Sequence, residues 1–144
     1  MILQKLVAEA HDRGEYGALL DAIPYARHIG LEVQRFGNEV LFVLPPKEEN
    51  LGNPVLPALH GGVIGGFLEL SAALHLVLFQ GVTRMPKIVD FSLDYLRAAR
   101  LVHTYAECRV TRQGRRVANV MVSAWQKTRT EPVATARAHF LIED

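Results

Sequence analysis

The sequence of 144 residues has few of the features that mark specialised classes of protein. It contains one cysteine, Cys108, so a disulfide framework and a zinc site built from several cysteines are both excluded. The formal net charge is +1, which is too small for bulk charge to indicate nucleic-acid binding. No internal repeat or low-complexity tract is present. With 49% hydrophobic and 22% charged residues, the composition is that of one globular domain with a proper core.

The N-terminus lacks the basic segment and the continuous apolar run of a secretory signal. Residues 1–14 instead mix both charges with apolar residues, and Ile2, Leu6 and Ala10 recur at helical spacing. We therefore expect a cytoplasmic protein that binds neither membrane nor nucleic acid.

One stretch, residues 59–79, is apolar around nearly its whole circumference, which predicts a helix buried in the middle of the domain. Gly81 follows as a stop signal. His60, Glu69 and His75 interrupt the run, which disfavours a span across a bilayer. At about 100° per residue two faces separate. The bulky face is Val63, Ile64, Phe67, Leu70, Leu74 and Leu78, and the small face is Gly62, Gly65, Gly66, Glu69, Ala72 and Ala73.

The small face carries a single carboxylate, that of Glu69. An isolated acid on a buried helix is costly unless it is paired, hydrogen-bonded or used in chemistry. Just before the helix, His60-Gly61-Gly62 supplies bare backbone N–H groups, where the helix dipole favours a developing anion. An oxyanion donor and a carboxylate on one helix are groups that acyl transfer needs.

The remaining chain predicts helices at residues 2–13 and 15–22, with Pro24 ending the second. Alternating residues predict a hairpin of strands 28–36 and 39–44 around Gly37-Asn38, and residues 47–58 read as a loop into the central helix. Four more strands are predicted at residues 88–96, 104–112, 115–127 and 132–142. This order predicts an α+β domain whose antiparallel sheet wraps the central helix.

His60-Gly61-Gly62, with an acid nine residues after the histidine, resembles the PaaI-like branch of the hotdog-fold acyl-CoA thioesterases, part of the 4-hydroxybenzoyl-CoA thioesterase superfamily. The resemblance continues in residues 89–99, 112–116 and 133–140, and it covers residues 25–142. It implies a hotdog fold, in which an antiparallel sheet wraps one long central helix. We expect this domain at residues 25–144, after an N-terminal helical segment at residues 1–24.

The resemblance also implies an activity, the hydrolysis of an acyl-CoA or aryl-CoA to a free acid and coenzyme A. Glu69 would act as general base or as nucleophile, the Gly61 N–H as oxyanion donor, and His60 would orient the carbonyl. No metal and no cofactor apart from the coenzyme A of the substrate are implied. Structural roles remain open: an acid at Glu69 bonded to backbone N–H groups or to a partner chain, a tight turn at the glycine pair, and a histidine at a helix start with its hydrogen bonds satisfied.

Substrate contacts are expected from polar, apolar and basic residues. The predicted set is Asn53, Gly62, Val63, Phe67, Arg97, Arg100, Arg115 and Arg116. Residues 81–144 hold eleven basic and six acidic residues, against five and nine in residues 1–80. The arginines would suit the phosphates of coenzyme A, although any one of them is equally well explained as a solvent-exposed charge with no ligand.

The other histidines and the cysteine carry no predicted role. We expect His75 in the core, His103 and His139 as ordinary strand or turn residues, and Cys108 as a buried, inert thiol. No pair of these residues has a convincing metal-ligand spacing.

Three positions depart from the family pattern. Pro54 stands where many relatives have asparagine, with Asn53 one place away, and Ile88 stands where serine or threonine is common. Ala98 replaces the proline of the Leu-Arg-Pro-Ala signature. The first two concern polar contacts to water and substrate, so a non-catalytic acyl-CoA-binding protein is an alternative.

A hotdog dehydratase is a weaker alternative. Residues 54–57 are Pro-Val-Leu-Pro, similar to the Pro-Val-Met-Pro of acyl-carrier-protein dehydratases, but residues 49–53 contain no histidine to serve that chemistry. The family resemblance further implies a homodimer or homotetramer with an active site shared between subunits. The stripe of small residues is consistent with a close neighbour of this kind.

Overall fold

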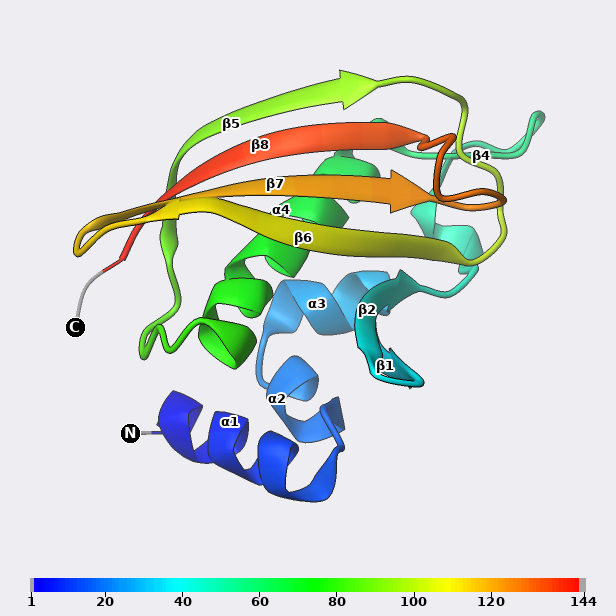
Figure 1. Cartoon of the computed structure of the whole chain (residues 1–144). Helices are drawn as coiled ribbons and strands as arrows, with labels where there is room; N and C mark the ends of the chain where they lie inside the picture. The colour runs from blue at the N-terminus through cyan, green and yellow to red at the C-terminus, as the bar shows by residue number, and fades with distance from the viewer. Residues whose placement is uncertain (1, 143–144) are drawn as a thin grey trace.

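The computed structural model of the protein describes residues 2–142. Figure 1 shows a curved sheet lying across the long helix α4 (Gly61–Phe79), with three shorter N-terminal helices on the side of α4 away from the sheet. An antiparallel sheet around one long helix is the hotdog arrangement, so the predicted α+β fold class is confirmed.

The main sheet has six strands in the order β1-β2-β6-β7-β8-β5, and every neighbouring pair is antiparallel. Their bounds are β1 (Glu32–Phe36), β2 (Glu39–Leu44), β5 (Lys87–Tyr95), β6 (Thr104–Gln113), β7 (Val117–Trp125) and β8 (Ala134–Leu141). Apart from β1, each strand begins and ends within two residues of its predicted limits. Strand β5 lies at an edge, paired only with β8 within the described residues.

Small side chains on the inner face of the sheet let it curve closely over α4. They are Ala106, Ala118, Ala124, Ala134, Ala136 and Ala138, all buried. The space that these alanines leave is filled from the helix by Phe67, Leu68 and Leu74, each 0% exposed. This burial removes most of the apolar circumference of α4 from water and is the main stabilising contribution to the fold.

Helix α4 is also long and apolar enough to cross a membrane by length and composition alone. More than half of it, 56% of the most apolar window, is buried inside the domain. The helix ends where predicted, because Gly81 takes a φ of 72°, a left-handed conformation that stops the helix.

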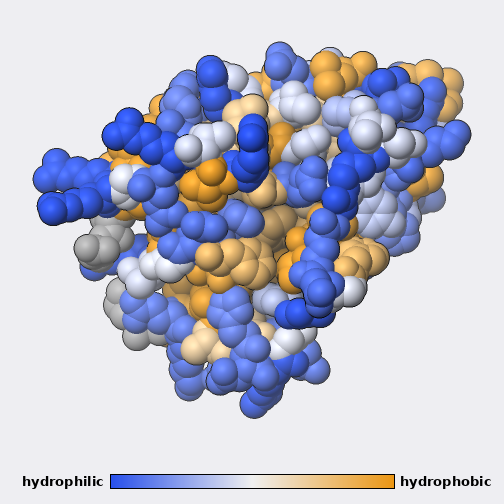
Figure 2. Space-filling model, in the orientation of Figure 1, coloured by the Kyte–Doolittle hydropathy of each residue, from blue (hydrophilic) through white to orange (hydrophobic). Residues whose placement is uncertain are grey.

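The N-terminal part consists of α1 (Ile2–Arg13), α2 (Gly17–Asp21) and α3 (Pro24–Ile29). The His11 Nε2–H donates to the Leu78 carbonyl over 2.7 Å and ties α1 to the end of α4. In the space-filling view, apolar side chains show between the sheet and these helices (Figure 2). An apolar groove of about 290 Å³ lies there, between α1 and the C-terminal end of α4.

Helix α3 corrects the prediction of a strand from residue 28. Pro24 occupies the first turn of α3, where proline is favoured, instead of merely ending the preceding helix. Gly30 ends α3 in the left-handed conformation at φ 82°, and the Asn50 Nδ2 donates to the Ile29 carbonyl over 2.8 Å. The strand β1 therefore starts only at Glu32. The predicted domain boundary after residue 24 falls at the start of α3.

The predicted loop at residues 47–58 is more ordered than expected. It contains a short 3₁₀ turn (Glu48–Asn50) and a small hairpin of β3 (Leu51–Asn53) with β4 (Ala58–Leu59). Within residues 2–142 these two strands pair only with each other, and they are too short for the periodicity of the sequence to reveal them.

The packing of α4 predicts a large effect of Phe67→Ala. Removing a fully buried ring under the sheet should lower the free energy of unfolding by about 3–5 kcal/mol, through lost burial and the cavity left behind. Chemical denaturation measures the change. Val55→Ala is the control, because Val55 is 89% exposed and should change the stability by no more than about 0.5 kcal/mol. Equal effects of the two substitutions would contradict this description of the core.

Candidate active site

The segment entering α4 is held in place by two close contacts. Gly52 of β3 lies so near His60 that a Cβ at position 52 would be 2.8 Å from the His60 Cα. The His60 N–H donates to the Asn50 carbonyl over 2.9 Å, and Asn50 is itself buried and bonded to the end of α3. The start of the helix is therefore fixed by β3 and by α3.

Hydrogen bonding at the N-terminus of α4 leaves one backbone donor unused. The exposed His60 caps the helix, since its Nδ1 accepts from the Gly62 N–H over 2.9 Å. The His60 carbonyl accepts from Val63 and Ile64 over 3.0 and 3.2 Å. No acceptor within residues 2–142 takes the Gly61 N–H. Among the first four backbone N–H groups of the helix, the Gly61 N–H is thus the one left for a ligand, and it is also the one predicted to hold an oxyanion.

Tyr95, at the end of β5, holds the Gly61 peptide from the other side. Its hydroxyl donates to the Gly61 carbonyl over 2.7 Å, and a Cβ at position 61 would lie 3.1 Å from this hydroxyl. A cavity of about 380 Å³ opens here and is lined by Gly61, Tyr95 and Arg97 among others. The sequence analysis did not single out Tyr95, although it lies within the residues that carry the family resemblance.

Glu69 lies half-buried on the same helix. Burial raises the pKa of its carboxyl group above the ordinary value of 4.5. No ion pair joins this carboxyl group to another side chain in the described part of the chain, and neither a side chain nor a backbone N–H there donates a hydrogen bond to it. Of the two structural alternatives, bonding to backbone N–H groups is therefore not what the structure shows, and bonding to a partner chain stays a prediction. An unpaired, desolvated carboxylate is typical of a functional site.

Glu69 points between two glycines of α4, because it follows Gly65 by four residues and Gly66 by three. A Cβ at Gly65 would lie 3.3 Å from Leu93 Cδ2 on β5, and one at Gly66 would lie 2.5 Å from Tyr25 Cε2 on α3. Gly65, Gly66 and Glu69 are each partly exposed, and we call this strip of α4, flanked by Leu93 of β5 and Tyr25 of α3, the Glu69 cleft. The small-residue stripe receives close neighbours from its own chain, so it is not by itself a sign of a partner subunit.

Within one chain the two candidate groups are too far apart to act on one carbonyl. Eight residues separate Gly61 from Glu69 on α4. At a rise of about 1.5 Å per residue they are about 12 Å apart along the axis. A single chain therefore contributes an oxyanion donor at one place and a carboxylate at another.

The other residues predicted to contact the substrate have different surroundings in the structure. Gly62 is exposed and Val63 is partly exposed at the N-terminal end of α4. The Asn53 Oδ1 accepts from the Val55 and Leu56 N–H groups over 3.0 and 3.3 Å, which gives it a role in the turn between β3 and β4. Phe67 has no exposed surface, so in this structure it packs in the core and does not line an open cleft.

The four arginines fall into two pairs at opposite ends of α4. Arg97 lines the cavity at Gly61, and the Arg100 Nη1 donates to the Leu56 carbonyl over 3.2 Å beside it. Arg115 and Arg116 line two hollows at the turn between β6 and β7, and Gly81 also borders that of Arg115. One chain does not bring all four to one phosphate group.

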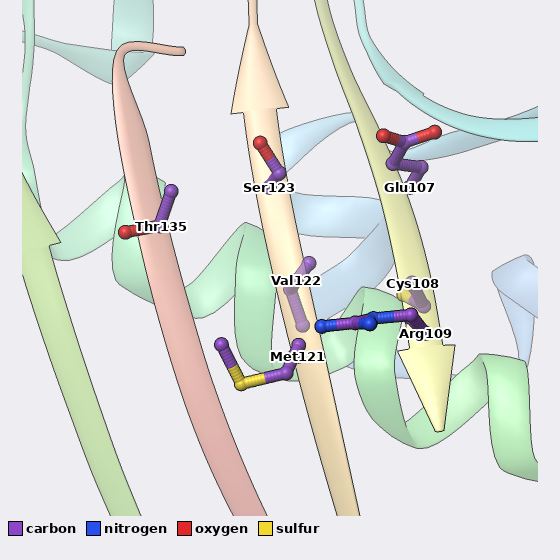
Figure 3. Close-up of a pocket in the computed structure, with 7 residues that line it drawn as sticks. All are labelled: Glu107, Cys108, Arg109, Met121, Val122, Ser123 and Thr135. Carbon is purple, nitrogen blue, oxygen red and sulfur yellow. The ribbon is translucent and has the colours of Figure 1, made fainter. Parts of the chain in front are cut away.

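A further hollow, of about 470 Å³, lies on the sheet and contains none of the predicted site residues. Figure 3 shows its side chains on β6, β7 and β8, with α4 behind the sheet. Cys108 is among them, and burial together with the neighbouring Glu107 raises the pKa of its thiol. The thiol is therefore protonated at neutral pH, but the expectation of a buried side chain is wrong, because Cys108 is partly exposed.

The histidines away from the helix start do not form a site with one another. His75 is half-buried against Phe79, and burial lowers its pKa. His139 Nδ1 lies 3.6 Å from Asp90 Oδ2 across neighbouring strands. Among residues 2–142 there is no cluster of three or more histidine, cysteine, aspartate or glutamate side chains able to hold a metal ion.

A hotdog fold with a free N–H at the helix start and an unpaired carboxylate on the helix defines a class of thioester-cleaving proteins. The family model of the Thioesterase superfamily matches residues 56–133, more than half of the chain, so the chain belongs to this superfamily and is a thioester hydrolase.

Individual relatives agree with this assignment. The chain is 28% identical over 135 residues to the medium/long-chain acyl-CoA thioesterase YigI of Escherichia coli K12, with 83% of this chain and 86% of YigI covered. A crystal structure of a protein from Chromobacterium violaceum is 44% identical, with a TM-score of 0.78 and 96% of both chains covered. A Bacillus halodurans protein crystallised with CoA shares the fold, with a TM-score of 0.71 at 17% identity over 81% of this chain and 76% of that one.

The environment of Glu69 predicts a stability gain on Glu69→Gln. Because the folded-state pKa is raised, the ionised carboxylate destabilises the fold above that pKa, and this penalty vanishes below the ordinary value of 4.5. The variant should therefore melt at a higher temperature than wild type at pH 7, and the difference should shrink towards pH 4. Thermal unfolding followed by circular dichroism measures it, with the exposed Glu9→Gln as control. A variant less stable at pH 7 would mean that the carboxylate is paired.

Proposed function

We propose that the protein hydrolyses an acyl-CoA thioester to a free acid and coenzyme A, with Glu69 as general base or nucleophile and the Gly61 N–H as oxyanion donor. The observation that carries the proposal is the half-buried, unpaired Glu69 carboxylate with a raised pKa, in a cleft of α4. The name of YigI makes medium and long acyl chains the first substrates to test.

In the general-base route, Glu69 takes a proton from water while the water oxygen bonds to the thioester carbon. The carbonyl oxygen becomes an anion, which the Gly61 N–H and the positive end of the α4 dipole stabilise. The C–S bond then breaks, and the thiolate of coenzyme A receives the proton held by Glu69. In the nucleophilic route Glu69 attacks the carbon itself, the C–S bond breaks to release the thiolate of coenzyme A, and water hydrolyses the resulting anhydride to the free acid and the Glu69 carboxylate.

The separation of about 12 Å along α4 favours a site completed by a second copy of the chain. Strand β5 ends one edge of the sheet, beside the cleft of Glu69, and it carries the exposed side chains of Val89 and Tyr95 at 62% and 55%. Pairing of two such edges would cover these residues. It would also allow Gly61 of one protomer to approach Glu69 of the other in a two-fold dimer.

Arg97 is the arginine best placed for a phosphate of coenzyme A. It is exposed and lines the cavity at Gly61, whereas the Arg100 side chain is bonded to the Leu56 carbonyl. Arg115 and Arg116 lie at the other end of α4 and would reach the same ligand only from a second chain.

Activity should depend on Glu69 in its ionised form. Release of free thiol from short, medium, long and aryl acyl-CoAs should fall by about 100-fold or more in Glu69→Gln. Because a base works only when deprotonated, wild-type kcat/KM should rise with pH around a midpoint above 4.5, the ordinary value for glutamate.

Glu9→Gln is the control for a lost surface charge, since Glu9 is an exposed acid on α1. Turnover that survives Glu69→Gln would remove Glu69 from the mechanism. If neither protein released thiol but acyl-CoA raised the melting temperature of both, the non-catalytic acyl-CoA-binding alternative would hold.

A shared site should permit complementation between two inactive variants. Gly61→Pro removes the N–H donor at the first helical position, where proline fits a helix, and Gly61→Ala adds the same Cβ but keeps the donor. The proline variant should lose far more kcat than the alanine variant. Refolding Gly61→Pro together with Glu69→Gln in equal amounts should restore about a quarter of wild-type activity, since half the dimers then contain one intact site of two.

The separately refolded variants, mixed only at assay, are the control for this experiment. A refolded mixture as inactive as its components would mean that both groups act within one chain. Light scattering measures the molar mass of the wild-type protein at assay concentration. A mass equal to that of one chain would exclude the shared site.

A further inference from the structure

One wall of the cleft at Glu69 consists of a single aromatic ring. Tyr25 is the second residue of α3, and its Cε2 and hydroxyl lie 2.5 and 3.0 Å from where a Cβ on Gly66 would stand. Side chains essentially never approach a real Cβ at 2.5 Å, so this ring position requires glycine at 66. Since Gly66 precedes Glu69 by about one turn, the ring lies within a turn of the carboxylate.

The ring of Tyr25 is presented to the outside of the domain rather than to its core. It is 43% exposed, and its aromatic neighbour is His28 on the same helix, at 6.1 Å between ring centres. An aromatic side chain held against helix backbone beside a carboxylate offers apolar contact area to a bound ligand.

The backbone that carries Tyr25 is held firmly. Pro24 sets the start of α3, Gly30 ends it, and the buried Asn50 binds the Ile29 carbonyl over 2.8 Å. The ring therefore has a defined place against Gly66 on the α3 side of α4, while Leu93 lies against Gly65 on the β5 side.

We propose that Tyr25 is a specificity-determining residue, whose ring limits the size of the acyl group that fits beside Glu69. The proposal rests on the proposed hydrolysis of acyl-CoA at this cleft. Truncation of the ring would uncover the bare backbone at Gly66, about one turn from Glu69. An unbranched acyl chain is slender enough to lie along this part of α4, and its apolar surface would then be partly removed from water.

The test is the chain-length preference of wild type, Tyr25→Ala and Tyr25→Phe, measured as kcat/KM on short, medium and long straight-chain acyl-CoAs. Tyr25→Ala should shift the ratio of long to short substrates by about tenfold or more in favour of the long ones. Tyr25→Phe keeps the ring and should keep the wild-type order. Phe36→Ala is the matched control, because Phe36 is 45% exposed on β1 and should leave the ratio unchanged.

Gly66→Ala tests the same contact from the helix side. The added Cβ displaces the Tyr25 ring, so it should change the long-to-short ratio in the wild-type background. In the Tyr25→Ala background no ring is present, so the same substitution adds only one methyl group to the uncovered helix surface and should change the ratio by clearly less. An equal effect of Gly66→Ala in both backgrounds would overturn the role of Tyr25.

Binding separates this proposal from the hydrolysis itself. Non-hydrolysable thioether analogues of the same acyl-CoAs, titrated into Glu69→Gln with and without Tyr25→Ala, report the preference without turnover. A ratio of affinities that Tyr25→Ala leaves unchanged would overturn the proposal even if hydrolysis is confirmed. A ratio of affinities that depends on Tyr25, with no hydrolysis by wild type, would support the role of Tyr25 and overturn the proposed hydrolysis. Absence of any binding would overturn both proposals.

Discussion

The structure depends on covering a helix that is apolar around almost its whole circumference. The sheet curves over α4 because its inner face consists largely of alanines, and the N-terminal helices cover much of the rest. Part of the stripe of small residues, at Gly65, Gly66 and Glu69, stays partly exposed, with Leu93 of β5 and Tyr25 of α3 against the two glycines. Burial of the helix thus provides both the stability of the domain and the partly desolvated environment that raises the pKa of the Glu69 carboxyl group.

The same helix separates Gly61 and Glu69, the two groups that the proposed mechanism needs. A helix N-terminus offers free donors only in its first turn, whereas the cleft of Glu69 lies about two turns further along. A carbonyl held by Gly61 is therefore out of reach of Glu69 in the same chain. In two copies related by a two-fold axis at β5, Gly61 of each chain could approach Glu69 of the other. The dimer would then contain two equivalent sites.

Gly65 and Gly66 have a different role from the one that the sequence suggested, which was close contact with a partner subunit. Gly65 and Gly66 make room for Leu93 and Tyr25 of the same chain, so the walls of the cleft are built on positions where the helix lacks side chains. Glycine inside a helix and an unpaired acid on it both weaken a fold. Their presence together on α4 is the pattern expected where stability has been exchanged for a binding site.

The sequence alone determined the central helix, five of the six main strands, and the candidate groups Gly61 and Glu69, because caps, turns and periodicity act over a few residues. It did not reveal α3 or the β3–β4 hairpin, since these short elements depend on distant partners such as Asn50. Only the tertiary structure decided which donor of α4 remains free, that Phe67 is buried, that the arginines lie at opposite ends, and that Tyr25 faces the cleft. Each of these depends on contacts between segments far apart in the chain, which no local pattern encodes.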